Sequence, residues 1–135
     1  MCIRDRLECP PGWPTNDGSS RVLYNWWIVP GYLKYDQLTH AYGFGLTTWL
    51  CWQGLVAALR AGGHENVQPT LGLMTLCAAG GMGFGALNEV IEFFATLTLP
   101  ETNVGGYRNT GWDLVSNLVG CSVAAVWIWL AGRCR

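Results

Sequence analysis

The feature that most constrains this chain is a set of three long segments that contain no Asp, Glu, Lys or Arg. They run from Leu38 to Leu59, from Thr70 to Asn88 and from Leu114 to Gly132, and the second continues as apolar sequence past two glutamates. About 20 helical residues cross a hydrocarbon layer of roughly 30 Å, so each segment is long enough to span a membrane. We therefore predict an all-α integral membrane bundle with spans at about residues 38–59, 70–97 and 114–132.

The overall composition supports a membrane protein. Only 13% of the residues are charged, against about 25% in an ordinary soluble domain. A soluble helical bundle would also repeat polar residues every third or fourth position, and the three segments lack such faces. A net charge of -1 without any basic run argues against nucleic acid as a partner.

The N-terminal part of the chain differs from the rest. Residues 1–20 mix Arg, Asp, Pro and Gly without an apolar face, and the opening six residues resemble translated sequencing-adapter sequence. We expect this segment to be disordered or artefactual, and a membrane domain to follow at residues 21–135. If the opening residues are an artefact, the natural chain has helices upstream of this domain. Residues 21–35 are rich in Trp and Tyr, which predicts an interfacial segment at headgroup depth.

Small residues recur four positions apart in each span, for example Ala41 with Gly45, Gly81 with Gly85, and Ser116 with Gly120. This spacing lets helix backbones approach closely, which promotes helix association in lipid. We interpret it as packing within the chain rather than as a dedicated dimer face.

Polar residues cluster at one depth of the predicted bundle. Since successive spans alternate in direction, the start of the first, the end of the second and the start of the third meet at one leaflet. Within these ends, residues four apart share a helical face. The sequence therefore predicts one shared pocket, drawn from Asp36, His40, Asn88, Glu89, Glu92, Asp113 and Asn117.

Three chemistries fit such a pocket. A divalent metal could be bound by His40, Glu89, Glu92 and Asp113, which are also the candidate catalytic residues; one His with carboxylates suits Zn, Mn or Fe. The same residues could pass protons, because carboxylates are costly in a membrane and usually serve a task there. The static alternative pairs the glutamates with His40, Lys34 or Arg108 and uses Asp113 to cap the last helix. None of the common hydrolase motifs is present. The sequence leaves open whether the protein is an enzyme of another class.

Three motifs in this order resemble a known family. They are Asp36-x-x-x-His40, Asn88-Glu-x-x-Glu92 and Asn109-Thr-Gly-Trp-Asp113-Leu-x-x-Asn117-x-x-Gly120. The chain is similar to YjdF-type and VanZ-like bacterial integral membrane proteins over about residues 35–130. That resemblance implies a small multi-pass protein of the bacterial inner membrane, with a link to envelope stress or glycopeptide resistance. Asn109 stands where the family pattern has an acid, which weakens the expectation of a metal.

The sequence thus favours a multi-pass membrane protein with a His/Glu/Asp pocket near one leaflet. The alternatives are a metal-dependent membrane enzyme acting on a lipid-linked or envelope substrate, and a proton-coupled small-solute transporter. No cofactor is certain beyond a candidate divalent metal. Expected partners are membrane lipid and either further copies of the chain or its own upstream helices.

Overall fold

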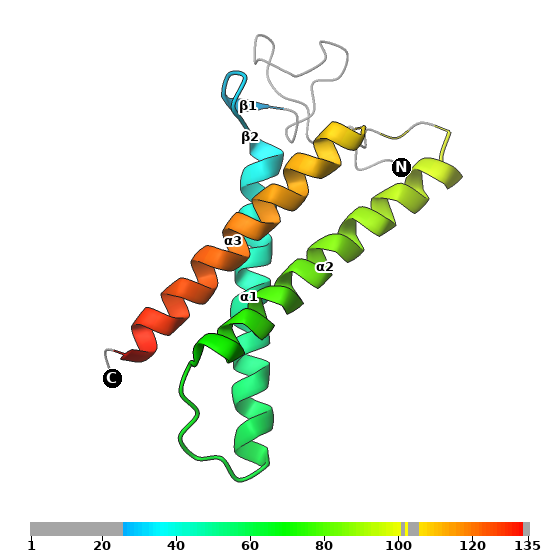
Figure 1. Cartoon of the computed structure of the whole chain (residues 1–135). Helices are drawn as coiled ribbons and strands as arrows, with labels where there is room; N and C mark the ends of the chain where they lie inside the picture. The colour runs from blue at the N-terminus through cyan, green and yellow to red at the C-terminus, as the bar shows by residue number, and fades with distance from the viewer. Residues whose placement is uncertain (1–25, 101, 103–105, 134–135) are drawn as a thin grey trace. The chain divides into compact units, whose positions relative to one another are not determined.

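The computed structural model describes residues 26–100, 102 and 106–133. Their elements follow in the order β1, β2, α1, α2 and α3 (Figure 1). The chain divides into two units, residues 1–39 and 40–135, which are described separately. The predicted disordered segment at residues 1–20 lies outside the described residues, and the boundary predicted at residue 20 therefore stays a prediction.

A short hairpin occupies the described part of the first unit. Strands β1 (Trp27–Val29) and β2 (Leu33–Lys34) pair antiparallel. The turn between them places Pro30 before Gly31, whose φ is +79°, and Tyr32 N donates to Val29 O at 3.0 Å. Pro followed by a glycine with positive φ is the signature of a type II turn. The segment predicted to be interfacial therefore contains a hairpin, which the sequence reasoning did not foresee.

Helix α1 (Tyr35–Ala61) is capped at both ends. At its start, the Gln37 side chain accepts a hydrogen bond from Lys34 N at 3.1 Å, as the third helical residue does in a capping box. At its end, His64 N donates to Leu59 O at 3.1 Å and Gly63 N to Arg60 O at 3.0 Å, while Gly63 has a φ of +90°. This is a Schellman motif, and it fixes the direction in which the following loop leaves the helix.

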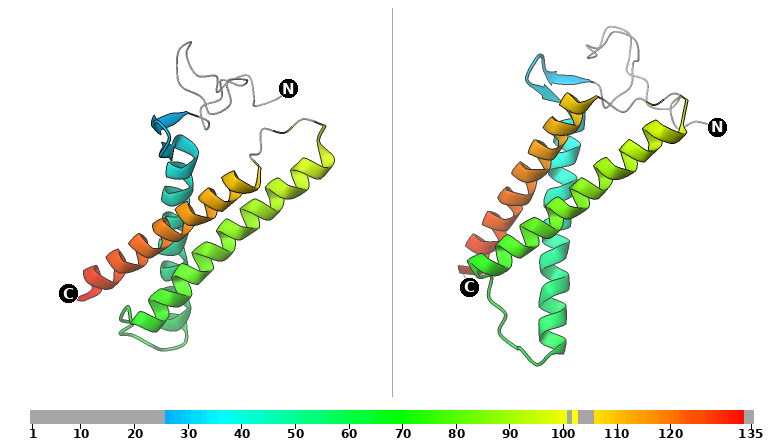
Figure 2. Two further views of the ribbon diagram at one scale, coloured as in Figure 1. Left: turned by 45° about the horizontal axis from the view of Figure 1, so that its top comes forward. Right: turned by 45° about the vertical axis from the view of Figure 1, so that its right-hand side comes forward.

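Helices α2 (Leu71–Thr98) and α3 (Tyr107–Arg133) complete the second unit. The Thr70 hydroxyl caps α2 by accepting from Leu73 N at 3.3 Å, and Pro100 follows soon after the helix ends. Both views of Figure 2 show α2 and α3 side by side in opposite directions, with α1 crossing them. Helix α3 starts seven residues earlier than the predicted span, because residues 107–113 form its first two turns.

The three helices approach closely at glycines. A Cβ on Gly45 would lie 3.1 Å from Gly120 O, and a Cβ on Gly120 would overlap the carbonyl of Ala41. On α2, a Cβ on Gly81 would meet the Thr48 hydroxyl and the Cys121 thiol. These contacts confirm that the small residues serve packing within the chain, which lets polar side chains of three helices reach one another.

Burial in this bundle is the reverse of that in a soluble protein. The largest fully buried side chains are Asn117, Thr48, Asp113 and Cys121. Large apolar side chains instead lie outside, among them Phe84, Ile91 and Phe94 on α2 and Val123 and Trp127 on α3. A lipid environment favours this arrangement, in which polar side chains lie inside the bundle and apolar side chains face outwards.

Of the described helices, α2 and α3 are long and apolar enough to cross a membrane. Helix α1 has a similar length, 27 residues, and occupies the position of the first predicted span, but it is not among the candidate spans. The difference arises because α1 carries a His, two Gln and three Thr among its apolar residues. The all-α prediction is confirmed, with two rather than three helices meeting the criterion for a span.

Candidate functional site

The first element of the site is His40, which lies near the start of α1. Its Nδ1 is 3.0 Å from Oδ1 of Asn117 on α3 and 3.8 Å from Oε1 of Glu89 on α2. A carbonyl oxygen can only accept, so Nδ1 donates to Asn117 in this arrangement. Phe44, one turn further along α1, packs against the imidazole with 5.8 Å between ring centroids. The His40 side chain thus contacts both α2 and α3.

Helix α2 supplies two carboxylates near its end. Glu89 is buried, with 8% of its surface exposed, and Glu92 accepts a hydrogen bond from Asn88 Nδ2 at 2.9 Å. One ligand-type atom from each of His40, Glu89 and Glu92 can be chosen so that all three lie within 4.8 Å of one another. The predicted convergence of these three residues is therefore present in the structure.

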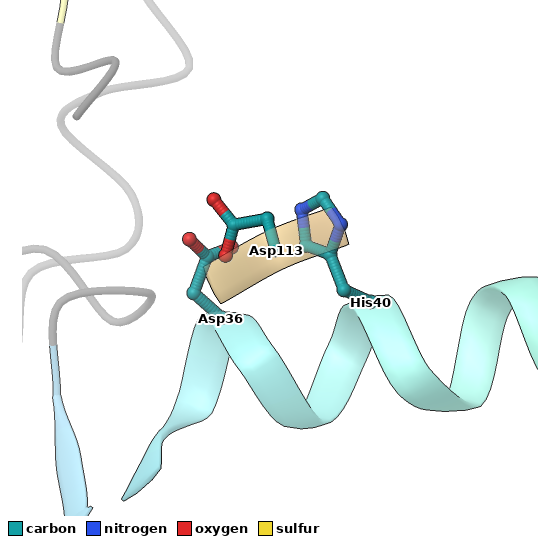
Figure 3. A group of neighbouring side chains, drawn as sticks. All are labelled: Asp36, His40 and Asp113. Carbon is teal, nitrogen blue, oxygen red and sulfur yellow. The ribbon is translucent and has the colours of Figure 1, made fainter. Parts of the chain in front are cut away.

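Helix α3 supplies Asp113 and Asn117, one turn apart and both fully buried. Asn109 Nδ2 donates to Asp113 Oδ2 at 2.6 Å from the preceding turn. Figure 3 shows Asp113 next to the His40 ring, and ligand-type atoms of the two residues lie within 4.8 Å. Asp36, also drawn there, precedes His40 by one turn of α1.

The position of Asp113 corrects one prediction. The static alternative gave this residue the N-cap of the last helix, but α3 begins at Tyr107, so Asp113 lies two turns inside it. Its carboxylate is held by the Asn109 side chain four residues earlier rather than by free backbone N–H groups. Asn109, where the family pattern has an acid, is thus a direct neighbour of the site.

The shape of the site depends on glycine spacing in α2. A Cβ on Gly85 would lie 2.6 Å from Asn117 Nδ2, so only glycine leaves room for this carboxamide between the helices. Gly81, Gly85 and Glu89 form one face of α2, with a spacing of four residues. The two glycines let α3 approach α2, and this approach brings Asn117 and Glu89 to the same imidazole.

Sequence reasoning missed Thr48, which is fully buried two turns below His40. Its hydroxyl donates to Phe44 O at 2.9 Å, and Cys121 Sγ donates to the same carbonyl at 3.4 Å. The signal was available, because His40, Phe44 and Thr48 repeat every four residues along one face of α1. This face is the one on which α1 meets the other helices.

Two basic residues lie away from this cluster. His64 is exposed in the loop between α1 and α2, at the opposite end of α1 from His40. Arg108 is exposed in the first turn of α3. Neither belongs to the group of His40, Glu89 and Glu92.

These features define a helical membrane protein that buries a cluster of polar side chains and carries large apolar side chains on its exterior. The chain belongs to the family described as "Predicted membrane protein (DUF2238)", whose sequence profile matches residues 19–133. No curated protein and no solved structure matches the chain. The resemblance to YjdF-type and VanZ-like proteins, and the particular membrane that it implies, stay predictions.

Proposed function

We propose that this protein binds a divalent transition-metal ion within the membrane, through His40, Glu89 and Glu92. The observation that carries the proposal is the convergence of one imidazole and two carboxylates from two helices within 4.8 Å. Ligands that share a metal at about 2.1 Å from each lie about 3 to 4 Å apart. The 3.8 Å between His40 Nδ1 and Glu89 Oε1 falls in that range.

A fourth donor is at hand on α3. Asn117 Oδ1 lies 3.0 Å from the same Nδ1 of His40, which is again a separation expected between two ligands of one ion. The metal-free imidazole donates its Nδ1 proton to this oxygen. Metal binding would move that proton to Nε2 and free both atoms for the ion, while the hydrogen bond holds the ring in place beforehand.

The donor set indicates which metals fit. One nitrogen with three oxygens is harder than the His-rich or Cys-rich sites typical of structural zinc. Carboxylate and carbonyl oxygens suit Mn²⁺, and imidazole extends the range towards Fe²⁺ and Zn²⁺. The site therefore suits Mn²⁺, with the open positions of its coordination sphere filled by water, while Fe²⁺ and Zn²⁺ should bind the same donors more tightly.

Charge supports the same conclusion. Each ionised carboxylate at membrane depth costs roughly 2.5 to 3.5 kcal/mol even on lenient insertion scales. A divalent cation bound by Glu89 and Glu92 balances both negative charges at once. It also compensates for burial, which is nearly complete at Glu89.

Elemental analysis of the purified, detergent-solubilised chain tests the proposal. After incubation with Mn²⁺ and gel filtration, the native chain should retain about one ion, and Glu89→Gln and His40→Gln should retain none. His64→Gln is the matched control, since this exposed histidine lies at the other end of α1. Monodisperse elution shows that each variant is folded.

Folded protein without stoichiometric Mn²⁺, Fe²⁺ or Zn²⁺ would overturn the proposal. Proton exchange between His40 and Glu89, 3.8 Å apart, would then be the function to pursue. Glu89→Gln should in that case abolish proton movement in reconstituted vesicles while folding persists.

A further inference from the structure

The far end of the bundle contains a pocket unrelated to the His40 cluster. It has a volume of about 440 Å³ and lies where α1 and α3 end, closed by the loop that joins α1 to α2. Its lining combines tryptophan side chains with one basic and one acidic residue. All of its lining residues belong to the second unit.

The loop that closes the pocket is held in place at both ends. The Schellman motif around Gly63 sets its path out of α1. At the other end, Pro69 packs against Gly132 of α3 so closely that a Cβ on Gly132 would overlap its ring. Between them, Val67 packs against the core formed by Trp52 and its neighbours. The shape of the pocket is thus fixed by specific contacts at both ends of the loop.

The walls of the pocket have the character of a membrane interface. Trp52 is buried at its base, while Trp49 and Trp127 are 44% and 72% exposed along its sides. Tryptophan concentrates where one end of the ring meets hydrocarbon and the other meets headgroups. Nearby, the Arg133 guanidinium lies 3.8 Å from the ring centroid of Trp129, which places a cation at the same level.

The charged residues of the lining have opposite signs. Arg60 ends α1 and Glu65 follows in the loop, and both are exposed. A guanidinium binds phosphate through paired charge-assisted hydrogen bonds. A carboxylate attracts an ammonium group, which also interacts favourably with an indole face. A purely anionic headgroup would meet repulsion from Glu65, whereas a headgroup that carries both charges satisfies both residues.

We propose that this pocket binds a phospholipid with an ammonium headgroup, of the phosphatidylethanolamine type. Its phosphate lies on Arg60, its ammonium lies between Glu65 and the exposed tryptophans, and its acyl chains leave along the apolar outer surface of the helices. The pocket volume admits a headgroup but not a whole lipid, so the chains remain in the bilayer. This inference is independent of the metal proposal, because it uses none of the same residues.

Native mass spectrometry of the full chain in detergent tests the assignment. The probes are phosphatidylethanolamine and phosphatidylglycerol with identical acyl chains, titrated separately. We expect the native chain to bind phosphatidylethanolamine about tenfold more tightly, the effect of one charge-assisted contact. Equal binding of both lipids would overturn the proposal and indicate non-selective lipid around the helices.

Two charge variants sharpen the test. Glu65→Lys should reverse the preference towards phosphatidylglycerol, and Arg60→Glu should weaken binding of both lipids about tenfold. Arg108→Glu is the matched control, because this exposed arginine lies in the first turn of α3, at the other end of that helix. Unchanged selectivity in Glu65→Lys, or unchanged affinity for both lipids in Arg60→Glu, with folded protein by gel filtration, would contradict the assignment.

A final measurement separates lipid from a soluble ligand of the same chemistry. Free phosphoethanolamine carries the same phosphate and ammonium but lacks acyl chains. We expect it to compete with the lipid only weakly, because the apolar contacts along α1 and α3 are absent. Displacement of the lipid by equimolar phosphoethanolamine would overturn the lipid assignment in favour of a small soluble ligand.

Discussion

The two ends of the helical bundle differ in the kind of side chain that they bury. At the end that contains His40, polar side chains are buried and large apolar ones face outwards. At the end that contains Trp52, an apolar core of Trp52, Met74, Cys77, Ala125 and Ile128 lies beneath a pocket with exposed charges. Burying polar groups within a membrane costs free energy, so such groups usually have a function. Charged groups exposed at the depth of the headgroups cost little free energy. The comparison therefore supports the two proposals, metal binding at the first end and lipid contact at the second.

The largest effect is expected from the glycine contact that brings α1 and α3 together. Gly120→Ala should destabilise the chain by about 1 to 3 kcal/mol or more, because the new Cβ overlaps the Ala41 carbonyl. The polar end should then open and lose its metal, since it needs three helices in contact. Denaturation by sodium dodecyl sulphate in mixed micelles measures the change.

Gly83→Ala provides the control for this variant. Gly83 is also in a helix, but a Cβ there meets nothing within 4 Å. Its stability should be unchanged or slightly raised, because alanine favours helix. Equal destabilisation by both substitutions would show that the close contact at Gly120 is not what holds the two helices.

A second prediction concerns Asn117, which touches His40 from α3. Asn117→Ala should lower Mn²⁺ affinity by about 10- to 100-fold, because it removes the proposed fourth donor and the hydrogen bond that holds the His40 ring. Isothermal titration of solubilised protein measures it. Lipid selectivity at the other end should not change. A simultaneous change in lipid binding would mean that the two ends are coupled and that the comparison is too simple.

A third prediction concerns the pH dependence of metal binding at the polar end. Metal affinity at the polar end should fall as the pH is lowered, since a metal ion competes with protons for imidazole and carboxylate ligands. The measurement is Mn²⁺ titration at several pH values. Affinity that does not change with pH would argue against His40 and the two glutamates as ligands.

The smallest effect is expected at the tryptophan-lined pocket. Trp127→Ala should weaken phosphatidylethanolamine binding by a few-fold, because a contact between an ammonium and an exposed indole is worth about 0.5 to 1 kcal/mol. Trp112→Ala is the matched control, since it removes a half-exposed tryptophan of the same helix outside the pocket. Equal losses in both variants would assign the effect to general interfacial anchoring.

Much of the polar end could be predicted from sequence, and the reason is geometric. Helices repeat every 3.6 residues and connected spans alternate in direction, so the depth and facing of His40, Glu89 and Asn117 follow from their positions. The hairpin at β1 and β2 was missed because its strands are only three and two residues long. The early start of α3 was missed because Asn109 and Gly111 are typical turn residues, and their helical state depends on contacts such as Asn109 with Asp113.

The pocket at the other end could not be predicted at all. It depends on the path of the loop between α1 and α2, which is set by the Gly63 turn and by the packing of Pro69 on Gly132. The two residues of that packing contact are far apart in sequence and show no periodic relation. The sequence indicated a turn there but contained no signal for what the turn would enclose.

The most direct test of the metal proposal is pulsed electron paramagnetic resonance of Mn²⁺ bound to the solubilised chain, which detects a nitrogen atom attached to the ion. The account predicts one imidazole nitrogen coupling that is absent in His40→Gln and retained in His64→Gln. Bound Mn²⁺ with only water and oxygen ligands in the native chain would contradict it.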